Sequence, residues 1–332
     1  MANERMPPRG IGGAVDRARK FLSVELRNGI RAARIRRKYG LDGQDRFSGE
    51  PGARFEVAAV AIFKGEDEYL REWIEFHRLV GVGHFFLYDN ADSEASRAIL
   101  APYVAAGLVT YTPFAEFPEK CLRSRYGKDQ FRKLSMQNLA YGDCARKYAW
   151  RCEWLAKIDL DEFLYPLEPC ATLPEAFGRP KRRDVKGFSV AASRFGPSDR
   201  LERTGLPVIE SYTMRYGELD RNWKAVGRGE FVSGWLGYHG CHNYFYKIDP
   251  ASRALDDSET MGAARINHYV VKSREEYLDK IVAHSAGHKA GKESPEKWDR
   301  TNAEARIPDE GAILRFLPAL KERLARAPGA SR

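Results

Sequence analysis

The feature that most constrains the fold is a repeated alternation of apolar, strand-like runs with helix-like segments. Residues 55–63 (FEVAAVAIF) form a continuous apolar run of the kind that a strand buried on both faces requires. Residues 66–80 follow with apolar side chains at helical spacing, and further strand-like runs lie at 85–88, 108–112 and 154–158. This alternation is typical of βαβ units, so we expect an α/β fold with a mostly parallel central sheet flanked by helices.

Two more helices are expected between these strands. One covers residues 93–106, where Pro102 should interrupt it because proline lacks the backbone N–H. The other covers residues 130–148. Ligands of a parallel sheet bind beyond the carboxyl ends of its strands, and polar residues gather at those ends in this sequence.

The second half of the chain is richer in short β-like runs. These runs are residues 185–192, 208–215, 243–248 and 265–271. Ser273-Arg-Glu-Glu276 has the capping-box pattern and should open a helix that reaches residue 284, and a C-terminal helix is expected over residues 310–324. The domain organisation we expect is a basic leader and linker (residues 1–53, partly helical or disordered), one α/β domain (54–290) and a helical extension (291–332).

The net charge of +9 is concentrated at the start of the chain. Residues 1–50 contain 12 Lys and Arg against 6 Asp and Glu, whereas residues 51–290 contain 34 against 33. A nucleic-acid-binding protein needs a basic face on its folded body, so we expect no nucleic-acid partner. Residues 15–39 have the pattern of an amphipathic basic helix. This pattern fits contact with a membrane surface, but equally a solvated segment or a helix packed on the domain.

Several classes of protein lack support in the sequence. It contains neither G-x-x-x-x-G-K-[ST] nor G-x-G-x-x-G, the motifs of P-loop and Rossmann proteins. Its five Cys include no C-x-x-C pair, which argues against a zinc ribbon and suits a reducing compartment. No secretory signal and no apolar run of about 20 residues is present. We therefore expect a cytoplasmic protein, with peripheral association with the inner face of the membrane left open.

Asp159 and Asp161 follow the apolar run 154–158 directly and are two residues apart. If the strand continues through them, both carboxylates point to the same face and can bind one cation. Mg²⁺ sites commonly combine one or two carboxylates with substrate phosphates, and an imidazole such as His268 can complete an Asp₂ site for Mn²⁺. The pattern alone leaves two alternatives open, an ordinary acidic turn for the Asp pair and a hydrogen-bonded core residue for His268.

Four segments along residues 60–285 resemble, in order, motifs of glycosyltransferase family 92. Residues 62–77 (IFKGEDEYLREWIEFH) with 81–90 (GVGHFFLYDN) resemble its opening motif, and residues 154–165 (WLAKIDLDEFLY) resemble its metal-binding D-x-D motif. Residues 193–198 (SRFGPS) resemble its F-G-S-S-type loop, and residues 266–280 (INHYVVKSREEYLDK) resemble its closing motif.

The resemblance implies a GT-A type nucleotide-diphospho-sugar transferase fold with a smaller β-rich half on the acceptor side. It implies that Asp159, Asp161 and His268 hold Mn²⁺ or Mg²⁺ against the donor diphosphate. It also implies a set of donor-binding residues, which are Lys64, Glu66, Asp89, Asn90, Gln137, Asn138, Asp159 and Lys272.

This chain departs from the family pattern at two places. Gly65 stands where an Asn is usual, so the turn around it loses a side-chain amide. Pro197 and Asp199 alter the F-G-S-S-type loop, so the role of that loop does not carry over.

The expected reaction is metal-dependent transfer of a sugar, with inversion, from a nucleotide-diphosphate donor to an acceptor hydroxyl. The resemblance favours a UDP-sugar donor and a glycan or lipid-linked acceptor. Lys272 or Arg228 is expected to add positive charge at the leaving group. The catalytic base is left open among three acids, which are Asp199, Asp220 and Glu230.

Two other functions stay open. One is a catalytically inactive binding module with the same fold. The other is a protein that binds an anionic membrane or polyanion through the basic leader.

Overall fold

The computed structural model describes residues 47–114, 136–178, 185–233, 240, 242–244, 246–247, 253–255, 262–284 and 294–329. The helix expected over residues 15–39 and the first six residues of the helix expected over 130–148 lie outside this part of the chain. The proposed division into leader, domain and extension stays a prediction. Among the helices that can be described, none combines the length and the apolar character needed to cross a bilayer.

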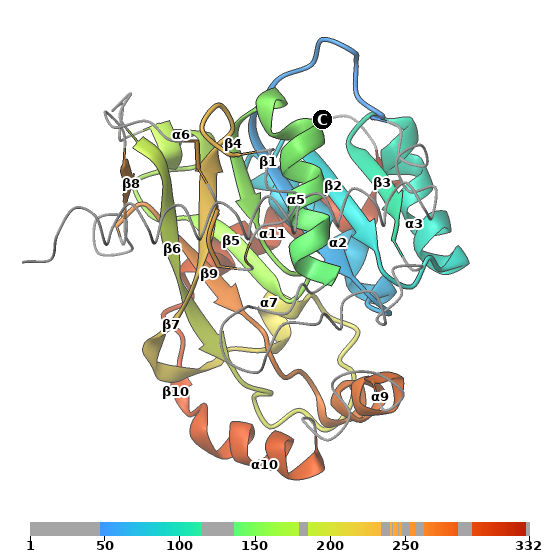
Figure 1. The fold of residues 1–332 in the computed structure, drawn as a ribbon. Coiled ribbons are helices and arrows are strands. Elements are labelled where there is room, and N and C mark those ends of the chain that lie inside the picture. Colours follow the sequence, from blue (N-terminus) through green and yellow to red (C-terminus); the bar gives the residue numbers. More distant parts are fainter. Residues whose placement is uncertain are drawn as a thin grey trace, which may run out of the picture.

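A mixed β-sheet forms the centre of the molecule (Figure 1). Its strands run in the order β3-β2-β1-β4-β7-β6-β9-β5, with β10 paired to β7 and β8 paired to β6. The strands are β1 (Phe55–Phe63), β2 (His84–Asp89), β3 (Val109–Pro113), β4 (Cys152–Lys157), β5 (Glu162–Pro166), β6 (Val185–Phe195), β7 (Met214–Arg228), β8 (Arg253–Leu255), β9 (Ala264–His268) and β10 (Ile307–Pro308).

Helices cover both faces of this sheet. In Figure 1, α5 lies across the near face, while α2 and α11 lie behind the sheet. The helices are α2 (Asp67–Leu79), α3 (Glu94–Ala105), α5 (Met136–Tyr148), α6 (Leu173–Gly178), α7 (Val208–Ser211), α9 (Arg274–His284), α10 (Pro295–Glu304) and α11 (Leu317–Ala325), with 3₁₀ turns η1 (Ala149–Arg151) and η2 (Ala312–Phe316).

Strand β1 is buried on both of its faces. Val57 and Ala59 belong to a core cluster shared with α2, whereas Ala58 and Val60 belong to a second cluster shared with α5. Successive side chains of a strand point to opposite faces, so a strand between two helical layers must be apolar at every position. The continuous apolar run of the sequence is explained by this position in the centre of the sheet.

The α/β fold predicted from the sequence is confirmed. Strands β3, β2, β1 and β4 are parallel neighbours, as the alternation of strands and helices predicted. The sheet then changes direction, because β7 runs antiparallel to both β4 and β6. This second part forms the smaller β-rich half, in which β9 lies between β6 and β5.

Two predictions about local structure are wrong. Helix α3 continues through Pro102. Both Pro102 and Ala98, whose carbonyl loses its donor, are exposed, so water can bond this carbonyl. The run 208–215 is not one strand, because α7 occupies its start and β7 begins at Met214. In the run 243–248, Tyr246 forms an isolated bridge with Val232.

The predicted capping box at the start of α9 is confirmed. The Ser273 Oγ accepts the Glu276 N–H at 3.2 Å, and the Glu276 carboxylate accepts the Ser273 N–H at 2.9 Å. The C-terminal helical region packs on the sheet domain, because Leu320 of α11 and Ile313 of η2 are fully buried in the larger core cluster.

Gly229, just after β7, packs closely against the backbone before and at the start of β4. A Cβ at this position would lie 1.9 Å from the carbonyl oxygen of Ala149 and 2.2 Å from that of Cys152. We expect Gly229→Ala to lower the free energy of unfolding by about 2 kcal/mol or more, because backbone must move to relieve the overlap. Gly178→Ala is the control, since nothing lies within 4 Å of its Cβ. Equal urea midpoints for the two variants would contradict this packing.

Candidate functional site

The acidic residues of the predicted D-x-D lie in a tight turn between β4 and β5. The Glu162 N–H donates to the carbonyl of Asp159 at 3.0 Å, which closes the turn. The expectation that Asp159 and Asp161 point to one face of a continuing strand is therefore wrong. The turn sends their carboxylates to different partners and brings Glu162, the first residue of β5, into the same group.

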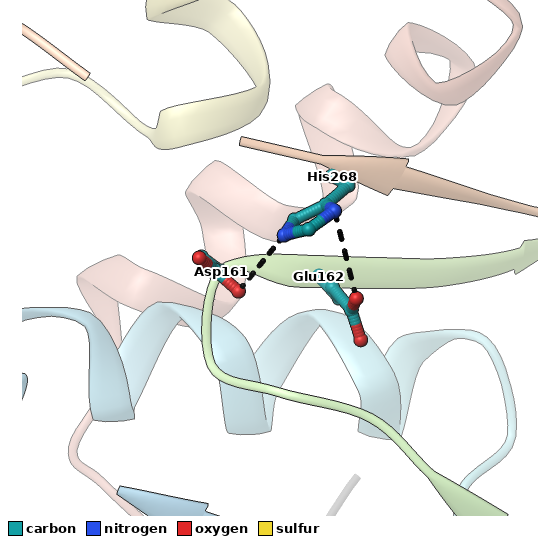
Figure 2. A group of neighbouring side chains, drawn as sticks. All are labelled: Asp161, Glu162 and His268. Atoms are coloured by element: carbon teal, nitrogen blue, oxygen red, sulfur yellow. Dashed lines mark ion pairs between the residues drawn. The ribbon is translucent and has the colours of Figure 1, made fainter. Parts of the chain in front are cut away.

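Asp161, Glu162 and His268 form one cluster (Figure 2). Figure 2 shows the imidazole of His268 lying above β5, between the two carboxylates. His268 Nε2 is 3.5 Å from Asp161 Oδ1, and His268 Nδ1 is 3.7 Å from Glu162 Oε1. One ligand atom from each residue can be chosen so that all three lie within 4.8 Å of one another.

The donor set of this cluster fits a divalent cation. Glu162 Oε1 and His268 Nδ1 are buried and have no hydrogen-bond partner within the described part of the chain. Buried polar atoms normally have hydrogen bonds, so these two atoms, which lie 3.7 Å apart as an ion pair, can both bind a cation. Two carboxylates and one imidazole are ligands that Mn²⁺ accepts, and carboxylates suit Mg²⁺.

The cluster is held in place by β9 and by helix α2. Tyr269, just after β9, donates its backbone N–H to the carbonyl of Asp161 at 2.8 Å. The buried Trp73 donates its indole N–H to the carbonyls of both Asp159 and Glu162, at 3.0 Å each. One turn later on α2, His77 Nε2 accepts the backbone N–H of Leu164 in β5 at 3.1 Å. Trp73 and His77 together fix the turn and the start of β5 against the helix.

Asp159 is engaged with protein groups rather than with the cluster. Its Oδ2 forms an ion pair with Lys224 of β7 at 2.6 Å. Its Oδ1 accepts from Gln137 Nε2 at 2.8 Å and from the Tyr141 hydroxyl at 3.0 Å, and both of these donors belong to α5. Burial would raise the pKa of Asp159, but Lys224 holds it below its usual value.

The charges within the cluster shift the pKa values of Asp161, Glu162 and His268 in different directions. Burial alone would raise the pKa of Asp161, but the facing His268 holds it well below the usual range. Burial alone would lower the pKa of His268, but Asp161 and Glu162 raise it. Burial dominates at Glu162, so its pKa is raised in spite of Lys224. A cation bound here replaces the positive charge that a protonated His268 supplies.

A cavity of about 180 Å³ lies next to the cluster, between the turn after β1 and helix α9. The predicted donor residues Lys64, Glu66 and Lys272 line it together with Lys280. Lys272 is nearly buried, with Nζ 3.9 Å above the Tyr69 ring. Glu66, Lys272 and Lys280 are all close enough to Asp161 to interact electrostatically. The structure therefore brings lysines and acids to one cavity beside the cluster.

The backbone at Gly65 explains one departure from the family pattern. Gly65 has φ of +66°, in the left-handed region, with no atom within 4 Å of the position of a Cβ. Glycine and asparagine are the residues that adopt this conformation most readily. Gly65 therefore preserves the turn between Lys64 and Glu66 in spite of the lost amide.

The other predicted donor residues have different surroundings. Asp89 is buried, and its carboxylate accepts the N–H groups of Ala91, Asp92 and Ser93 and the hydroxyl of Tyr111, so its own loop occupies it. The N–H of Asn90 donates to the carbonyl of Phe63 at 2.8 Å, which places Asn90 beside the end of β1.

The first turn of α5 carries the last two donor predictions. Gln137 reaches the acidic turn through its hydrogen bond to Asp159. Asn138 is buried on the same helix.

Two of the three candidate bases, Asp199 and Glu230, lie outside the cluster. Asp199 is exposed, and its hydrogen bonds to Arg306 and Asn302 hold its pKa below the usual value. Glu230 is an exposed residue that pairs with Arg228 at 3.2 Å. Asp220 lies on β7 opposite Ala192, and its side chain lies outside the described residues.

The prediction that Arg228 serves the leaving group is wrong. Arg228 pairs in register with Trp154, near the start of β4, whereas Asp159 follows the end of that strand. Lys224, four residues earlier on β7, is the basic residue that reaches the acidic turn.

Sequence reasoning missed Glu162 and Lys224 as site residues, and it considered Lys280 only as a residue that could neutralise phosphate charge. Glu162 directly follows the D-x-D, and a fully buried Glu or Lys requires a partner. The available signal for Lys224 was its place between apolar residues in a β-like run (NWKAV). Lys280 carried a weaker signal, because a single Lys on a helix is usually solvated.

The fold and the cluster together define an α/β protein whose sheet edge can hold a divalent cation, near a cavity lined by both basic and acidic side chains. The family model of Glycosyltransferase family 92 matches residues 55–193. This segment contains the acidic turn and the whole parallel half of the sheet. The chain is therefore similar to glycosyltransferase family 92 over residues 55–193.

Relatives named for the same family cover most of this chain at low identity. A family 92 protein of Oryza sativa subsp. japonica is 24% identical over 228 residues, which are 68% of this chain and 35% of that protein. Family 92 proteins of Ricinus communis (24%, covering 70% and 39%) and Arabidopsis thaliana (23%, covering 71% and 38%) are similar in the same way. The chain therefore spans little more than a third of the length of these relatives.

Among solved structures, a mannosyltransferase (PcManGT) of Pyrobaculum calidifontis in complex with GDP-Man and Mn²⁺ is similar at 18% identity. The match covers 96% of this chain and 87% of that chain, with a TM-score of 0.29. A TM-score this low carries no information about the site.

The indole N–H of Trp73 gives a direct test of how the acidic turn is held. Trp73→Phe keeps an aromatic ring but leaves two buried carbonyls without their shared donor. We expect the free energy of unfolding to fall by about 1–3 kcal/mol. Trp150→Phe is the control, because Trp150 is 52% exposed. Chemical unfolding of both variants checks the prediction, and equal losses would refute the role of the shared donor.

The titration of Glu66 predicts how stability changes with pH. Burial and the nearby Asp161 raise its pKa from 4.5 to about 7. Between these pH values the folded state holds a proton that the unfolded state has lost, so the free energy of unfolding falls as pH rises. We expect Glu66→Gln to reduce the loss of stability between pH 5 and pH 8 by about 2 kcal/mol, measured by urea unfolding. Glu94→Gln on α3 is the control, and an unchanged profile in Glu66→Gln would contradict the assignment.

Proposed function

We propose that this protein is a metal-dependent glycosyltransferase that moves a sugar from a nucleoside-diphosphate donor to a hydroxyl acceptor. The observation that carries the proposal is the cluster of Asp161, Glu162 and His268, in which the buried Glu162 Oε1 and His268 Nδ1 have no hydrogen bond within the described residues. These atoms are suited to one divalent cation at the carboxyl edge of a parallel sheet, where ligands of such sheets bind. The match of residues 55–193 to the model of glycosyltransferase family 92 supports the class of reaction.

The residues of the site have distinct roles in this proposal. Asp161, Glu162 and His268 hold Mn²⁺ or Mg²⁺, which when bound offsets the charge that develops on the leaving nucleoside diphosphate. Lys272 and Lys280 supply fixed positive charge on the cavity wall, where the diphosphate oxygens bind. Lys272, Lys280 and the cation therefore all stabilise the negative charge that develops on the leaving diphosphate.

The turn after β1 contributes to donor binding in two ways. Lys64 is exposed at the cavity and is free to reach a phosphate or the nucleotide. Glu66 carries a proton below about pH 7, which reduces its repulsion of an anionic donor. The donor is expected to be UDP-linked, and the acceptor a glycan or lipid-linked hydroxyl.

The acceptor side of the proposed mechanism needs a catalytic base. Inversion at the anomeric carbon requires a base that removes the acceptor proton. Asp199 is engaged with Arg306, and Glu230 lies beyond the far end of β4. We therefore infer that Asp220 on β7, four residues before Lys224, is the first of the three acids to test.

The proposal extends to the location of the protein. We propose a cytoplasmic enzyme whose basic residues 15–39 contact the inner face of the membrane, near a lipid-linked acceptor. The charge of the leader supports this proposal, because polybasic segments bind anionic lipid surfaces.

The test of the proposed function is Asp161→Asn. We expect Mn²⁺-dependent hydrolysis or transfer of the donor to fall at least 100-fold, with Mn²⁺ binding by calorimetry weakened in parallel, because Asp161 is a ligand. The donor is first identified by a thermal-shift screen of UDP- and GDP-sugars with Mn²⁺, since a ligand that binds only the folded state raises its melting temperature. Asp92→Asn is the control, because Asp92 lies in a left-handed turn that Asn tolerates.

Each alternative function has its own outcome in these experiments. Nucleotide-sugar binding without turnover of any donor would favour an inactive binding module. Full metal-dependent turnover by Asp161→Asn would refute the metal role. Retention of function only by proteins that keep residues 1–46 would favour the anionic membrane or polyanion binder.

A further inference from the structure

Lys224 occupies an unusual position at the base of the acidic turn. It lies on β7 and is 3% exposed. Its Nζ is 2.6 Å from Asp159 Oδ2 and 3.1 Å from Glu162 Oε2, so one ammonium group bridges two carboxylates. Lys224 therefore places one positive charge between two carboxylates of the site.

The three acids of the turn differ in how the protein occupies their oxygens. Both oxygens of Asp159 are engaged, by Lys224 on one side and by Gln137 and Tyr141 on the other. The Oε2 of Glu162 is engaged by Lys224 and by the Asp159 N–H at 2.9 Å. Glu162 Oε1 points the other way, toward His268. The protein thus satisfies Asp159 and half of Glu162, and leaves the other half of Glu162 to the cluster.

The balance of charges also assigns Lys224 to Asp159 and a divalent cation to the cluster. Asp159, Asp161 and Glu162 carry three negative charges when ionised, and Lys224 carries one positive charge. A divalent cation brings the remaining two, so the group becomes neutral with one such ion and an uncharged His268. Buried charges are tolerated when they are paired in this way.

We propose that Lys224 is a built-in cation that holds Asp159 out of the metal site, so that the exchangeable metal is bound by Asp161, Glu162 and His268 alone. Lys224 is a positioning residue, because it fixes Glu162 Oε2 and thereby directs Oε1 toward His268. This inference rests on the metal dependence in the proposed function. It departs from the expectation that both acids of the D-x-D bind the metal.

The first experiment measures Mn²⁺ binding to the full chain by calorimetry. We expect Asp159→Asn to change the Mn²⁺ dissociation constant by no more than about threefold. Asp161→Asn and Glu162→Gln should each weaken binding at least tenfold. The absorption spectrum of bound Co²⁺ provides a second readout, which should be unchanged in Asp159→Asn and altered in Glu162→Gln, because only Glu162 is a ligand. Loss of Mn²⁺ binding in Asp159→Asn with retention in Glu162→Gln would overturn the assignment.

The second experiment measures the ion pair without any metal. Urea unfolding of Asp159→Asn, Lys224→Met and the double variant gives a double-mutant cycle. We expect Lys224→Met to raise the unfolding equilibrium constant at least tenfold, and the double variant to raise it by less than the product of the two single effects. Lys224→Arg, which keeps the charge, should recover part of the loss. A double variant whose effect equals the product would show that the two side chains act independently and would refute the proposal.

The two experiments separate this inference from the proposed function. A wild-type protein that binds no Mn²⁺ would refute the metal dependence and the ligand assignment together. An additive cycle in a protein that does bind Mn²⁺ would refute the role of Lys224 alone.

Discussion

The structure depends on three carboxylates, one buried and two partly buried, within one four-residue turn. Like charges at this spacing repel, and taking each out of water costs several kcal/mol unless it is paired. The surrounding elements meet this cost from different directions. Helix α2 supplies the Trp73 indole to the backbone of the turn, α5 supplies Gln137 and Tyr141, β7 supplies Lys224, and β9 supplies His268. The sheet order brings these elements together at the end of β4.

The part of the fold that depends on local pattern could be predicted from the sequence. The apolar run of β1, the helical spacing of α2 and the capping box of α9 are properties of short segments, and each formed as expected. The D-x-D also marked the right turn. The error concerned its geometry, because two acids separated by one residue look alike whether they lie in a strand or in a turn. Only the turn sends Asp159 to Lys224 and Asp161 to His268.

The rest of the site could not be predicted because it is made by contacts between distant segments. Lys224 and Asp159 are 65 residues apart, and nothing near Lys224 in the chain announces an acidic partner. Asp89 shows the opposite case. A buried acid at the end of β2 looks like a ligand in the sequence, yet its carboxylate stabilises its own loop by accepting three backbone N–H groups. Occupancy of side-chain oxygens is a property of the folded molecule.

Lys224 and the residues that line the cavity come from different kinds of structural element. Lys224 enters the site from a long strand, where it pairs in register with Val190 of β6. The residues lining the cavity come instead from a turn and from the segment around α9. The side chains that line the cavity can therefore change without disturbing the ion pairs of Lys224 with Asp159 and Glu162.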